Sequence, residues 1–334
     1  MKNHNKKKIE WSSPSLLPKE LIFIDGVTRS GKSMLGPVIS SLNKTYPTQQ
    51  QTLLDNLLPI YAAKYINKNV FKSLINFYFN KNLYYMNISR EINLRPDDAS
   101  SFVHHKDFKL FKKNLKSTEG DHVIKNIKKK NYYPVFMTHD LLSMLTDFNE
   151  INVPYKLLYI YRHPIDNIFS FFKRYQLRMS SKNNTKYNLD DPRFHQMMIK
   201  FKGKLLPYYT LKEEAYFSKL NFLEKSTFYY LQSINSSIKT YKKLNKNQRK
   251  KILLIKFDDF AEKIDLELNK ISNFLGLKKT SHTKKILMRN NLPRKMFPNE
   301  REFKMSQLKK NISNELFKEL NDLTEKYEKS SLFI

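Results

Sequence analysis

The sequence predicts an α/β fold in which a mainly parallel central sheet is flanked by helices in three layers. Three stretches support this prediction, because in each an apolar run of strand length leads through a short polar loop into a helix. They are residues 21–35, 133–145 and 155–175. Residues 250–260 add a further apolar run of strand character. Right-handed connections are expected between the strands of such a sheet.

The loop inside the first stretch is suited to binding an anion. Gly26 and Gly31 allow the backbone to turn tightly, so that successive N–H groups point inward. The helix that begins near Lys32 adds unpaired amides and the positive end of its dipole. Arg29 and Lys32 contribute side-chain charge to the same loop. The loop is therefore predicted to hold a phosphate or a group of similar shape.

Two enzyme patterns fit this loop. Gly26 to Ser33 matches G-x-x-x-x-G-K-[ST], the Walker A pattern of nucleoside-triphosphate enzymes. Its inner part also resembles the Arg/Lys-Ser-Gly-Thr-Thr loop with which sulfotransferases hold the 5′-phosphosulfate of 3′-phosphoadenosine-5′-phosphosulfate (PAPS). This resemblance implies a set of donor-binding residues: Thr28, Arg29, Ser30, Gly31, Lys32 and Ser33. The loop alone favours a triphosphate enzyme.

Residues 155–175 favour the second pattern. Arg162 follows the predicted strand, Pro164 suits the first turn of a helix, and Asp166 lies in that turn. A nucleotide kinase could offer a carboxylate for magnesium at this strand end, whereas this chain offers a guanidinium. The stretch resembles the sulfotransferase 3′-phosphate motif, Arg-x-x-Pro-x-Asp followed by a Ser on the helix. The resemblance implies that Arg162 and Ser170 bind the 3′-phosphate of PAPS.

A catalytic base is implied by the strand at residues 133–137. Thr138-His139 follows it and resembles the Thr-His of cytosolic sulfotransferases, whose His takes the proton of the acceptor hydroxyl. An imidazole suits this task because its unperturbed pKa of about 6.5 leaves it largely neutral in the cell. Met137 stands where those enzymes carry a Lys. Asp140 is expected to cap a helix over residues 141–145.

The role of His139 has alternatives. The side chain could instead be a hydrogen-bonded histidine at a strand end, and His104 and His105 are rival bases with a weaker motif around them. Arg29 and Lys32 are expected to replace the missing Lys in stabilising the transition state, and with His139 they form the predicted catalytic set.

The last third of the chain supplies weaker signals. Asp258 and Asp259 follow the strand at residues 250–260 and would position magnesium in a kinase. The segment also resembles the late sulfotransferase segment that leads to Phe-Leu-Gly, here ending at Gly276, where the two carboxylates are structural. Arg294 and Lys295 resemble the basic loop that touches the 3′-phosphate, although Met296 replaces its Gly.

Two polar segments are candidates for contact with the acceptor. Residues 89–101 are dense in charge, and Arg90, Arg95, Asp97 and Ser101 could shape a polar pocket facing the sulfonate or form a surface salt-bridge cluster. Residues 179–191 are polar and irregular, as expected of a lid or acceptor loop.

Composition limits the remaining possibilities. The chain has 334 residues, a net charge of +30 and no cysteine, so thiolate metal sites and disulfides are excluded. We expect a basic extension at 1–20 and one domain at 21–330 with a helical insertion at about 51–130. The N-terminus lacks the apolar core of a signal peptide and no apolar run reaches bilayer length, which favours a cytoplasmic protein without a transmembrane segment. The basic clusters lack interleaved aromatics, so nucleic acid is not the expected partner.

The sequence as a whole resembles the sulfotransferase branch of the P-loop fold. The resemblance implies in-line transfer of a sulfonyl group from PAPS to an acceptor hydroxyl, with no metal required because the loop cations neutralise the leaving group. An ATP- and magnesium-dependent P-loop kinase that uses Gly26–Ser33 is the alternative enzyme, and a basic scaffold without turnover is the alternative outside enzymes. The acceptor, whether glycan, lipid or small molecule, and the oligomeric state are left open, although the positive charge favours an anionic acceptor.

Overall fold

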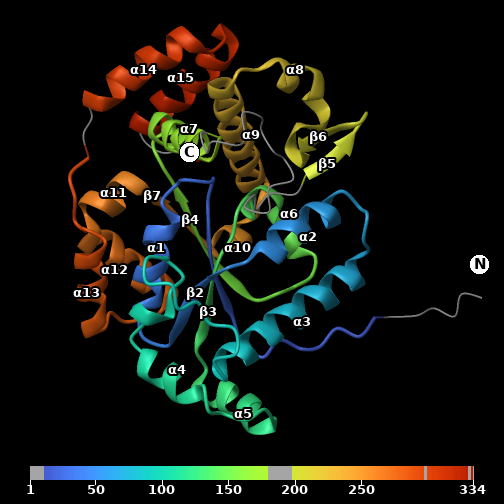
Figure 1. Ribbon diagram of the computed structural model, residues 1–334, viewed down its shortest axis with the longest axis vertical. Helices are drawn as coiled ribbons and strands as arrows, with labels where there is room; N and C mark the ends of the chain where they lie inside the picture. The colour runs from blue at the N-terminus through green and yellow to red at the C-terminus, as the bar shows by residue number, and fades with distance from the viewer. Residues whose placement is uncertain (1–10, 180–197, 297–298, 330–331, 334) are drawn as a thin grey trace, which may run out of the picture.

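The computed structural model describes residues 11–179, 198–296, 299–329 and 332–333. Its centre is a parallel five-stranded sheet with the strand order β2-β3-β1-β4-β7 (Figure 1). The strands of this sheet are β1 (Leu21–Asp25), β2 (Thr45–Gln50), β3 (Tyr133–Met137), β4 (Tyr155–Tyr161) and β7 (Ile252–Lys256). A separate antiparallel hairpin joins β5 (Met198–Phe201) to β6 (Lys204–Pro207).

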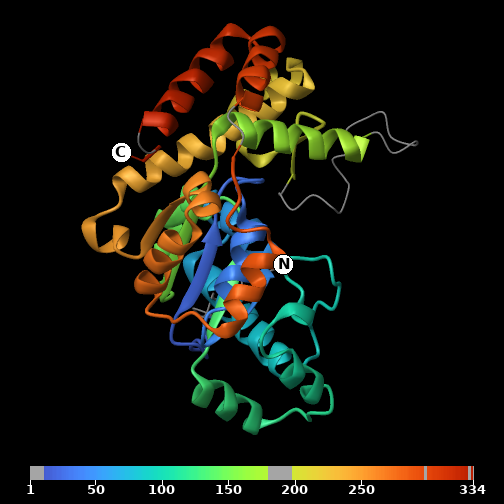
Figure 2. The same ribbon diagram turned by 90° about the vertical axis from the view of Figure 1, so that its left-hand side faces the viewer.

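Helices cover both faces of the sheet and extend beyond its two ends (Figures 1 and 2). The helices before β4 are α1 (Lys32–Ser40), α2 (Thr52–Ala62), α3 (Lys68–Asn87), α4 (Phe108–Asn114), α5 (Asp121–Lys130) and α6 (Leu145–Asn149). Those between β4 and β7 are α7 (Pro164–Met179), α8 (Glu214–Lys219), α9 (Phe222–Lys243) and α10 (Lys246–Arg249). The later ones are α11 (Phe257–Glu262), α12 (Ile264–Leu275), α13 (Ser281–Arg289), α14 (Asn299–Asn311) and α15 (Asn314–Lys329). Short 3₁₀ turns are η1 (Phe102–His104), η2 (Leu142–Met144) and η3 (Tyr208–Glu213).

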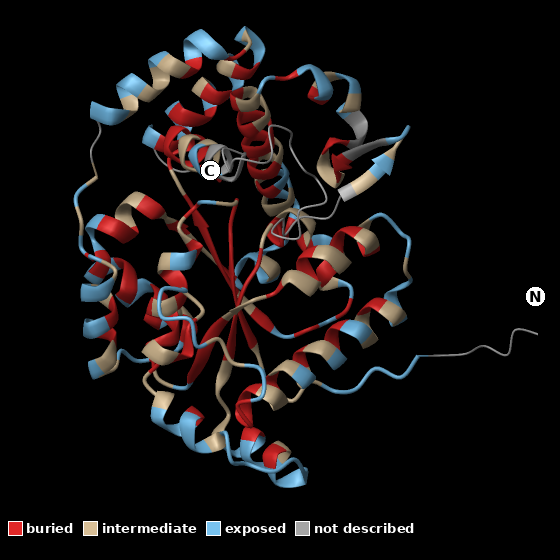
Figure 3. Ribbon diagram, viewed as in Figure 1, coloured by how far each residue is buried: buried red, intermediate tan, exposed pale blue. Residues whose placement is uncertain are grey.

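The central strands bury both faces, as a parallel sheet requires (Figure 3). Alternate residues of β1 enter different cores: Phe23 packs with α2, α3 and α9, whereas Ile22 and Ile24 pack with α1, α11 and α12. The predicted three-layer arrangement and parallel sheet are therefore confirmed. A third cluster joins α3 to α4 and α5, around Phe102 and Phe111. The expected insertion at 51–130 corresponds to α2–α5 in position, and its status as an insertion stays a prediction.

The parallel register brings the strands' carboxyl ends to one edge of the sheet. Ile24 of β1 pairs with Met137 of β3 and with Leu158 of β4, and Tyr161 of β4 pairs with Lys256 of β7. The segments that follow these strands therefore lie side by side. This edge gathers the glycine loop, the segment at 138–141, the start of α7 and the start of α11.

Some elements were not predicted from the sequence. Strand β2 contains Pro47 and its pairing shifts between Thr45 and Thr48, which an edge strand tolerates because one of its sides needs no ladder hydrogen bond. The hairpin β5–β6 and helix α14 were also missed. The two helices α8 and α9 agree with the expectation for 214–244. Of the proposed lid, residues 180–191 lie outside the described residues.

The expected helix cap by Asp140 is wrong. Residues 141–149 form η2 and α6, and neither has a side-chain cap. The carboxylate that accepts the backbone N–H of Leu142, over 2.8 Å, belongs to Asp25 at the end of β1. Asp140 instead adopts a left-handed conformation with φ of 58°, which turns the chain directly after His139.

Candidate active site

The glycine loop between β1 and α1 depends on two residues without a side chain. Gly26 has φ of 147° and Gly31 has φ of 112°, values that L side chains rarely adopt. A Cβ on Gly26 would overlap the carbonyl oxygen of Ile160, and a Cβ on Gly31 would overlap the ring of Phe257. The loop is thus pressed against β4 and α11, which fixes the first amides of α1.

The polar side chains of the loop point in different directions. The Nζ of Lys32 is buried and donates to the carbonyl oxygens of Gly26 and, over 3.2 Å, Val27. The hydroxyl of Thr28 lies 2.9 Å from that of Tyr229 on α9. Ser30 is buried, and its hydroxyl has no hydrogen-bond partner among the described residues. Ser33 is exposed on the first turn of α1.

Lys32 is held in a charged environment below the protein surface. Burial lowers its pKa, while the carboxylates of Asp25, Asp140 and Asp55 oppose this shift. These side chains come from β1, the segment after β3, and α2 respectively. A lysine in this position can move from the loop carbonyls to an incoming anion without leaving the loop.

Three arginines meet at the next strand end. Arg162, at the end of β4, and Arg294 both lie over the ring of Phe257, with guanidinium carbons 4.9 and 5.5 Å from its centre. The Nε of Arg29 donates to the hydroxyl of Ser170 on α7 over 3.0 Å. Burial lowers the pKa of Arg162; the charge of Asp166 opposes this shift, and the charge of Arg294 reinforces it. The Nε of Arg162 is buried and has no hydrogen-bond partner among the described residues.

The nearby carboxylates are occupied by other cations. Asp166 accepts from Arg301 and Lys304 of α14, over 2.8 and 2.9 Å, and Asp258 accepts from Arg301 over 2.8 Å. These hydrogen bonds hold the pKa of Asp166 below its usual range although its burial acts in the opposite direction. Cations of α14 are thus paired with the acids next to Arg162. The arginine cluster keeps an excess of positive charge, which suits a phosphate dianion.

A histidine–carboxylate pair lies at the end of β3. The Nδ1 of His139 is 2.9 Å from Oδ2 of Asp55, and the backbone N–H of His139 donates to Oδ1 of Asp55 over 2.7 Å. The side chain of Asp55 is only 4% exposed and that of His139 is 13% exposed. Burial, followed by the charge of Lys32, lowers the pKa of His139 well below its usual value. The imidazole is therefore neutral near pH 7, with its proton on Nδ1 and the lone pair on Nε2.

Asp55 was not singled out from the sequence. It lies in the apolar stretch Leu53-Leu54-Asp55-Asn56-Leu57-Leu58, and one acidic residue on the buried face of a predicted helix is the signal that was available. Asp25 and Asp140 were likewise not proposed as site residues. All three carboxylates are buried where the strands end.

The remaining candidates lie elsewhere or make no such contact. Lys295 is exposed beside the arginine cluster. The Nε2 of His104 is 2.8 Å from the carbonyl oxygen of Pro96, and that of His105 is 3.2 Å from Nζ of Lys106. Burial, with the charge of Lys106, lowers the pKa of His105 well below its usual value. His139 is the candidate base that the structure pairs with a buried carboxylate.

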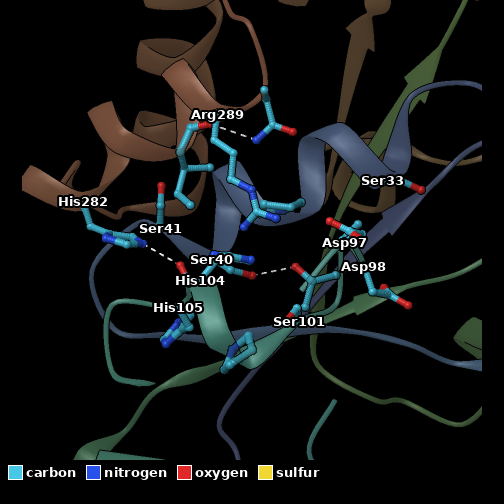
Figure 4. Close-up of a pocket in the computed structure, with 16 residues that line it drawn as sticks. Ser33, Ser40, Ser41, Asp97, Asp98, Ser101, His104, His105, His282 and Arg289 are labelled. Carbon is cyan, nitrogen blue, oxygen red and sulfur yellow. Dashed lines mark hydrogen bonds between the residues drawn. The ribbon is translucent and has the colours of Figure 1, made fainter. Parts of the chain in front are cut away.

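The charge-dense segment at 89–101 is divided between two places. Asp97 and Ser101 line a cavity of about 230 Å³ beside the outer face of α1, together with His104, His105 and Arg289 (Figure 4). The cavity reaches Ser33 at one end. In contrast, Arg90 forms an exposed ion pair with Glu119, and Arg95 is exposed. Arg90 thus forms a single surface ion pair, and a role of this cavity in binding the acceptor stays a prediction.

The fold and these residues define a class of protein. An α/β domain presents a glycine loop with a lysine, a cluster of arginines next to it, and a neutral histidine at the adjoining strand end. This arrangement suits an enzyme that transfers a group from a donor with two anionic ends. Residues 19–330 match the family model of the sulfotransferase domain, so the chain belongs to the sulfotransferase family. Family membership favours sulfonyl transfer over the kinase alternative.

Solved structures similar to this chain are also sulfotransferases. The sulfotransferase domain of the Synechococcus PCC 7002 olefin synthase is 15% identical, with 82% of this chain and 80% of that chain covered and a TM-score of 0.41. A sulfotransferase from Alicyclobacillus acidocaldarius is 14% identical, with coverage of 92% and 96% and a TM-score of 0.39. Mouse sulfotransferase SULT7A1, solved with PAP, is 14% identical, with coverage of 81% and 63% and a TM-score of 0.37. No curated protein sequence matches the chain.

Two further properties concern metals and membranes. Among the residues that the structure describes, no three His, Asp or Glu side chains are placed to share a metal ion. None of the described helices combines the length and the apolar character needed to span a bilayer.

Proposed function

We propose that the protein transfers a sulfonyl group from PAPS to an acceptor hydroxyl. The observation that supports this most directly is the cluster of Arg29, Arg162 and Arg294, whose neighbouring acids are paired with α14. A cluster of like charges is unfavourable unless an anion joins it. A 3′-phosphate would supply that anion, and neither ATP nor a simple sulfate ester carries one.

The residues present fit a donor with two anionic ends. The loop from Gly26 to Ser33 would receive the 5′-phosphosulfate, where the unpartnered hydroxyl of Ser30 and the Nζ of Lys32 offer donors. Arg162, Ser170 and Arg294 would hold the 3′-phosphate. Lys295 is retained as an outer contact with the same phosphate. Bound PAPS supplies a sulfur centre with a good leaving group.

The chain's own groups would carry the proton and the developing charge. His139 would accept the proton of the acceptor hydroxyl at Nε2 while its Nδ1–H donates to Asp55. The acceptor oxygen forms its bond to sulfur as the bond from sulfur to the bridging oxygen breaks. The departing electron pair stays on 3′,5′-adenosine bisphosphate. Lys32 and Arg29 would stabilise that charge, and loss of one such group typically costs ~10²–10³ in rate.

Two substitutions separate binding from chemistry. His139→Ala should preserve the affinity for adenosine 3′,5′-bisphosphate and abolish its release from PAPS, because the base does not contact the donor. Lys32→Ala should reduce both. A thermal-shift titration with the bisphosphate in the absence of metal, next to ATP with and without magnesium, measures the first quantity. Stabilisation by magnesium-ATP alone would contradict the proposal.

A further inference from the structure

The carboxyl ends of β1 and β3 carry an unbalanced set of buried charges. Asp25, Asp55 and Asp140 are 0%, 8% and 6% exposed, and the one buried lysine among them, Lys32, is 4% exposed. His139 is neutral here, so the described buried groups carry three carboxylates against one ammonium. Buried charge is costly unless it is paired and hydrogen-bonded. Two of these carboxylates therefore lack a compensating charge of their own.

The hydrogen bonds identify the carboxylate that is compensated least. Asp25 accepts from the hydroxyl of Thr138 and the backbone N–H of Leu142, and Asp55 accepts from two N–H groups of His139. Asp25 thus fixes the chain at Thr138 and Leu142, and Asp55 fixes His139.

Asp140 has weaker partners among the described residues. Its carboxylate receives the hydroxyl of Tyr208 over a long 3.4 Å and the hydroxyl of Ser233. Both of these groups are neutral. Burial, followed by the charge of Asp25, raises the pKa of Asp140, and the charge of Lys32 opposes this shift only in part. A positive charge placed beside Asp140 would remove this penalty.

The backbone holds Asp140 next to the proposed base. Its φ of 58° is unusual for a residue other than glycine, although aspartate tolerates it better than most. Such conformations persist where the surrounding structure imposes them, and they concentrate at functional sites. Asp140 directly follows His139, so the two Cα atoms are about 3.8 Å apart, and Asp140 is the nearest carboxylate in sequence to the proposed base.

Aromatic rings surround the same place. The ring of Tyr208 lies edge-on to that of Tyr209 with centres 5.7 Å apart, and Tyr209 lies 5.0 Å from Tyr229. Aromatic faces together with a carboxylate are the surroundings that favour organic ammonium groups. The described His, Asp and Glu side chains are not arranged to share a metal ion. The chemistry of these side chains therefore fits an organic cation.

We propose that Asp140, Tyr208 and Ser233 form a subsite for a positive charge on the acceptor, an ammonium or a guanidinium close to the hydroxyl that becomes sulfonated. The assignment rests on the proposed sulfonyl transfer and names its acceptor class as cationic amino alcohols or aminophenols. It replaces the anionic acceptor expected from net charge, because the charge that an acceptor meets at the site is that of Asp140.

The experiment compares acceptors with and without an ammonium group. Choline is paired with 3,3-dimethylbutan-1-ol, tyramine with 4-ethylphenol, and glucosamine with glucose. Release of adenosine 3′,5′-bisphosphate from PAPS gives kcat/KM for each, and thermal shifts with the bisphosphate present give binding. We expect the ammonium member of at least one pair to exceed its neutral partner about tenfold or more in both measurements.

Asp140→Asn is the test variant and Asp147→Asn its matched control. Asparagine also tolerates positive φ, so the variant should keep the backbone conformation. Removal of a poorly compensated carboxylate should leave the melting temperature unchanged or higher. Asp147 lies on α6 in an ion pair with exposed Lys64. The ammonium preference should disappear in Asp140→Asn and persist in Asp147→Asn.

The outcomes distinguish this proposal from the one on which it rests. Equal binding of charged and neutral partners by the unsubstituted protein, including no binding of either, overturns the subsite without reference to any variant. Persistence of the preference in a folded Asp140→Asn protein does the same. Failure of adenosine 3′,5′-bisphosphate to bind would instead overturn the sulfonyl transfer itself.

Discussion

Replacement of Arg162 by alanine should weaken the binding of a ligand that carries a 3′-phosphate and leave other adenine nucleotides unaffected. The guanidinium lies over the ring of Phe257, and its Nε is buried without a hydrogen-bond partner among the described residues. It is thus in place before any ligand arrives. Its removal should relieve repulsion with Arg294 and Arg29 and lose attraction to Asp166 and Asp258. Since cations of α14 still pair with both acids, the folded protein should not become markedly less stable.

The expected loss follows from the hydrogen bonds that Arg162 can offer. A guanidinium commonly binds a phosphate through two N–H groups, and each hydrogen bond to a charged group contributes about 1.5–3 kcal/mol. Two such bonds correspond to a Kd that rises by about 10²–10⁴. Because Arg294 and Ser170 would still bind the same phosphate, we take the lower end and expect an increase of about 10².

Thermal-shift titration measures this loss with two ligands. At a hundred times Kd the bisphosphate should stabilise the unsubstituted protein by about 2.7 kcal/mol, and the same concentration should give about 0.4 kcal/mol with Arg162→Ala. Adenosine 5′-monophosphate should bind both proteins equally. Arg249→Ala is the control, because Arg249 is exposed and donates to backbone oxygens of α9. Equal losses for the two nucleotides, or no loss for the bisphosphate, would refute this assignment.

Three further predictions concern the base, the loop and the packing of α14. Asp55→Asn should lower kcat by about 10²–10⁴, the range of general-base catalysis, because an amide no longer fixes the tautomer of His139. Steady-state kinetics should show this loss, while the affinity for the bisphosphate is retained. Gly31→Ala should lower the free energy of unfolding by about 1–3 kcal/mol because of the positive φ at this position, and contact of the new methyl group with Phe257 should lower it further. Urea unfolding measures this loss, and an unchanged urea midpoint would contradict the loop geometry. Since hydrogen bonds from α14 lower the pKa of Asp166 in the folded state, its contribution to stability is present above about pH 4 and is lost as the pH falls through the folded-state pKa. In Asp166→Asn the melting temperature should fall less steeply as the pH is lowered, which melting curves recorded over a series of pH values measure.

The parts predicted from the sequence are those in which one local pattern determines the structure. The glycine loop, the strand and helix around Arg162, and the strand before His139 each combine an apolar run with a turn residue at its end. A parallel sheet then brings such strand ends together, so Arg29 and Ser170 meet although 141 residues separate them. The family and the fold are confirmed on this basis. The roles of the individual site residues stay predictions.

The parts not predicted depend on contacts between distant segments. The sequence around Asp25 contains no capping pattern, because the backbone N–H that donates to it belongs to Leu142, more than 110 residues later. Strand β2 was missed because its polar residues and Pro47 follow neither strand nor helix periodicity, and it is an edge strand stabilised by β3. Asp140 was assigned to a cap since its position before a helix is the usual place for one.

The buried carboxylates explain how one sheet edge can serve opposite charges. On the side of β4, the acids Asp166 and Asp258 are paired with cations of α14, and the arginines there remain available to an anion. On the side of β3, Asp55 accepts hydrogen bonds from N–H groups of His139. Asp140 accepts from the hydroxyls of Tyr208 and Ser233, and the charge of Lys32 compensates it only in part. The field thus changes from positive to negative across the loop that holds Lys32. A donor with negative charge and an acceptor with positive charge would each be drawn to its own side, which places the reacting atoms between them.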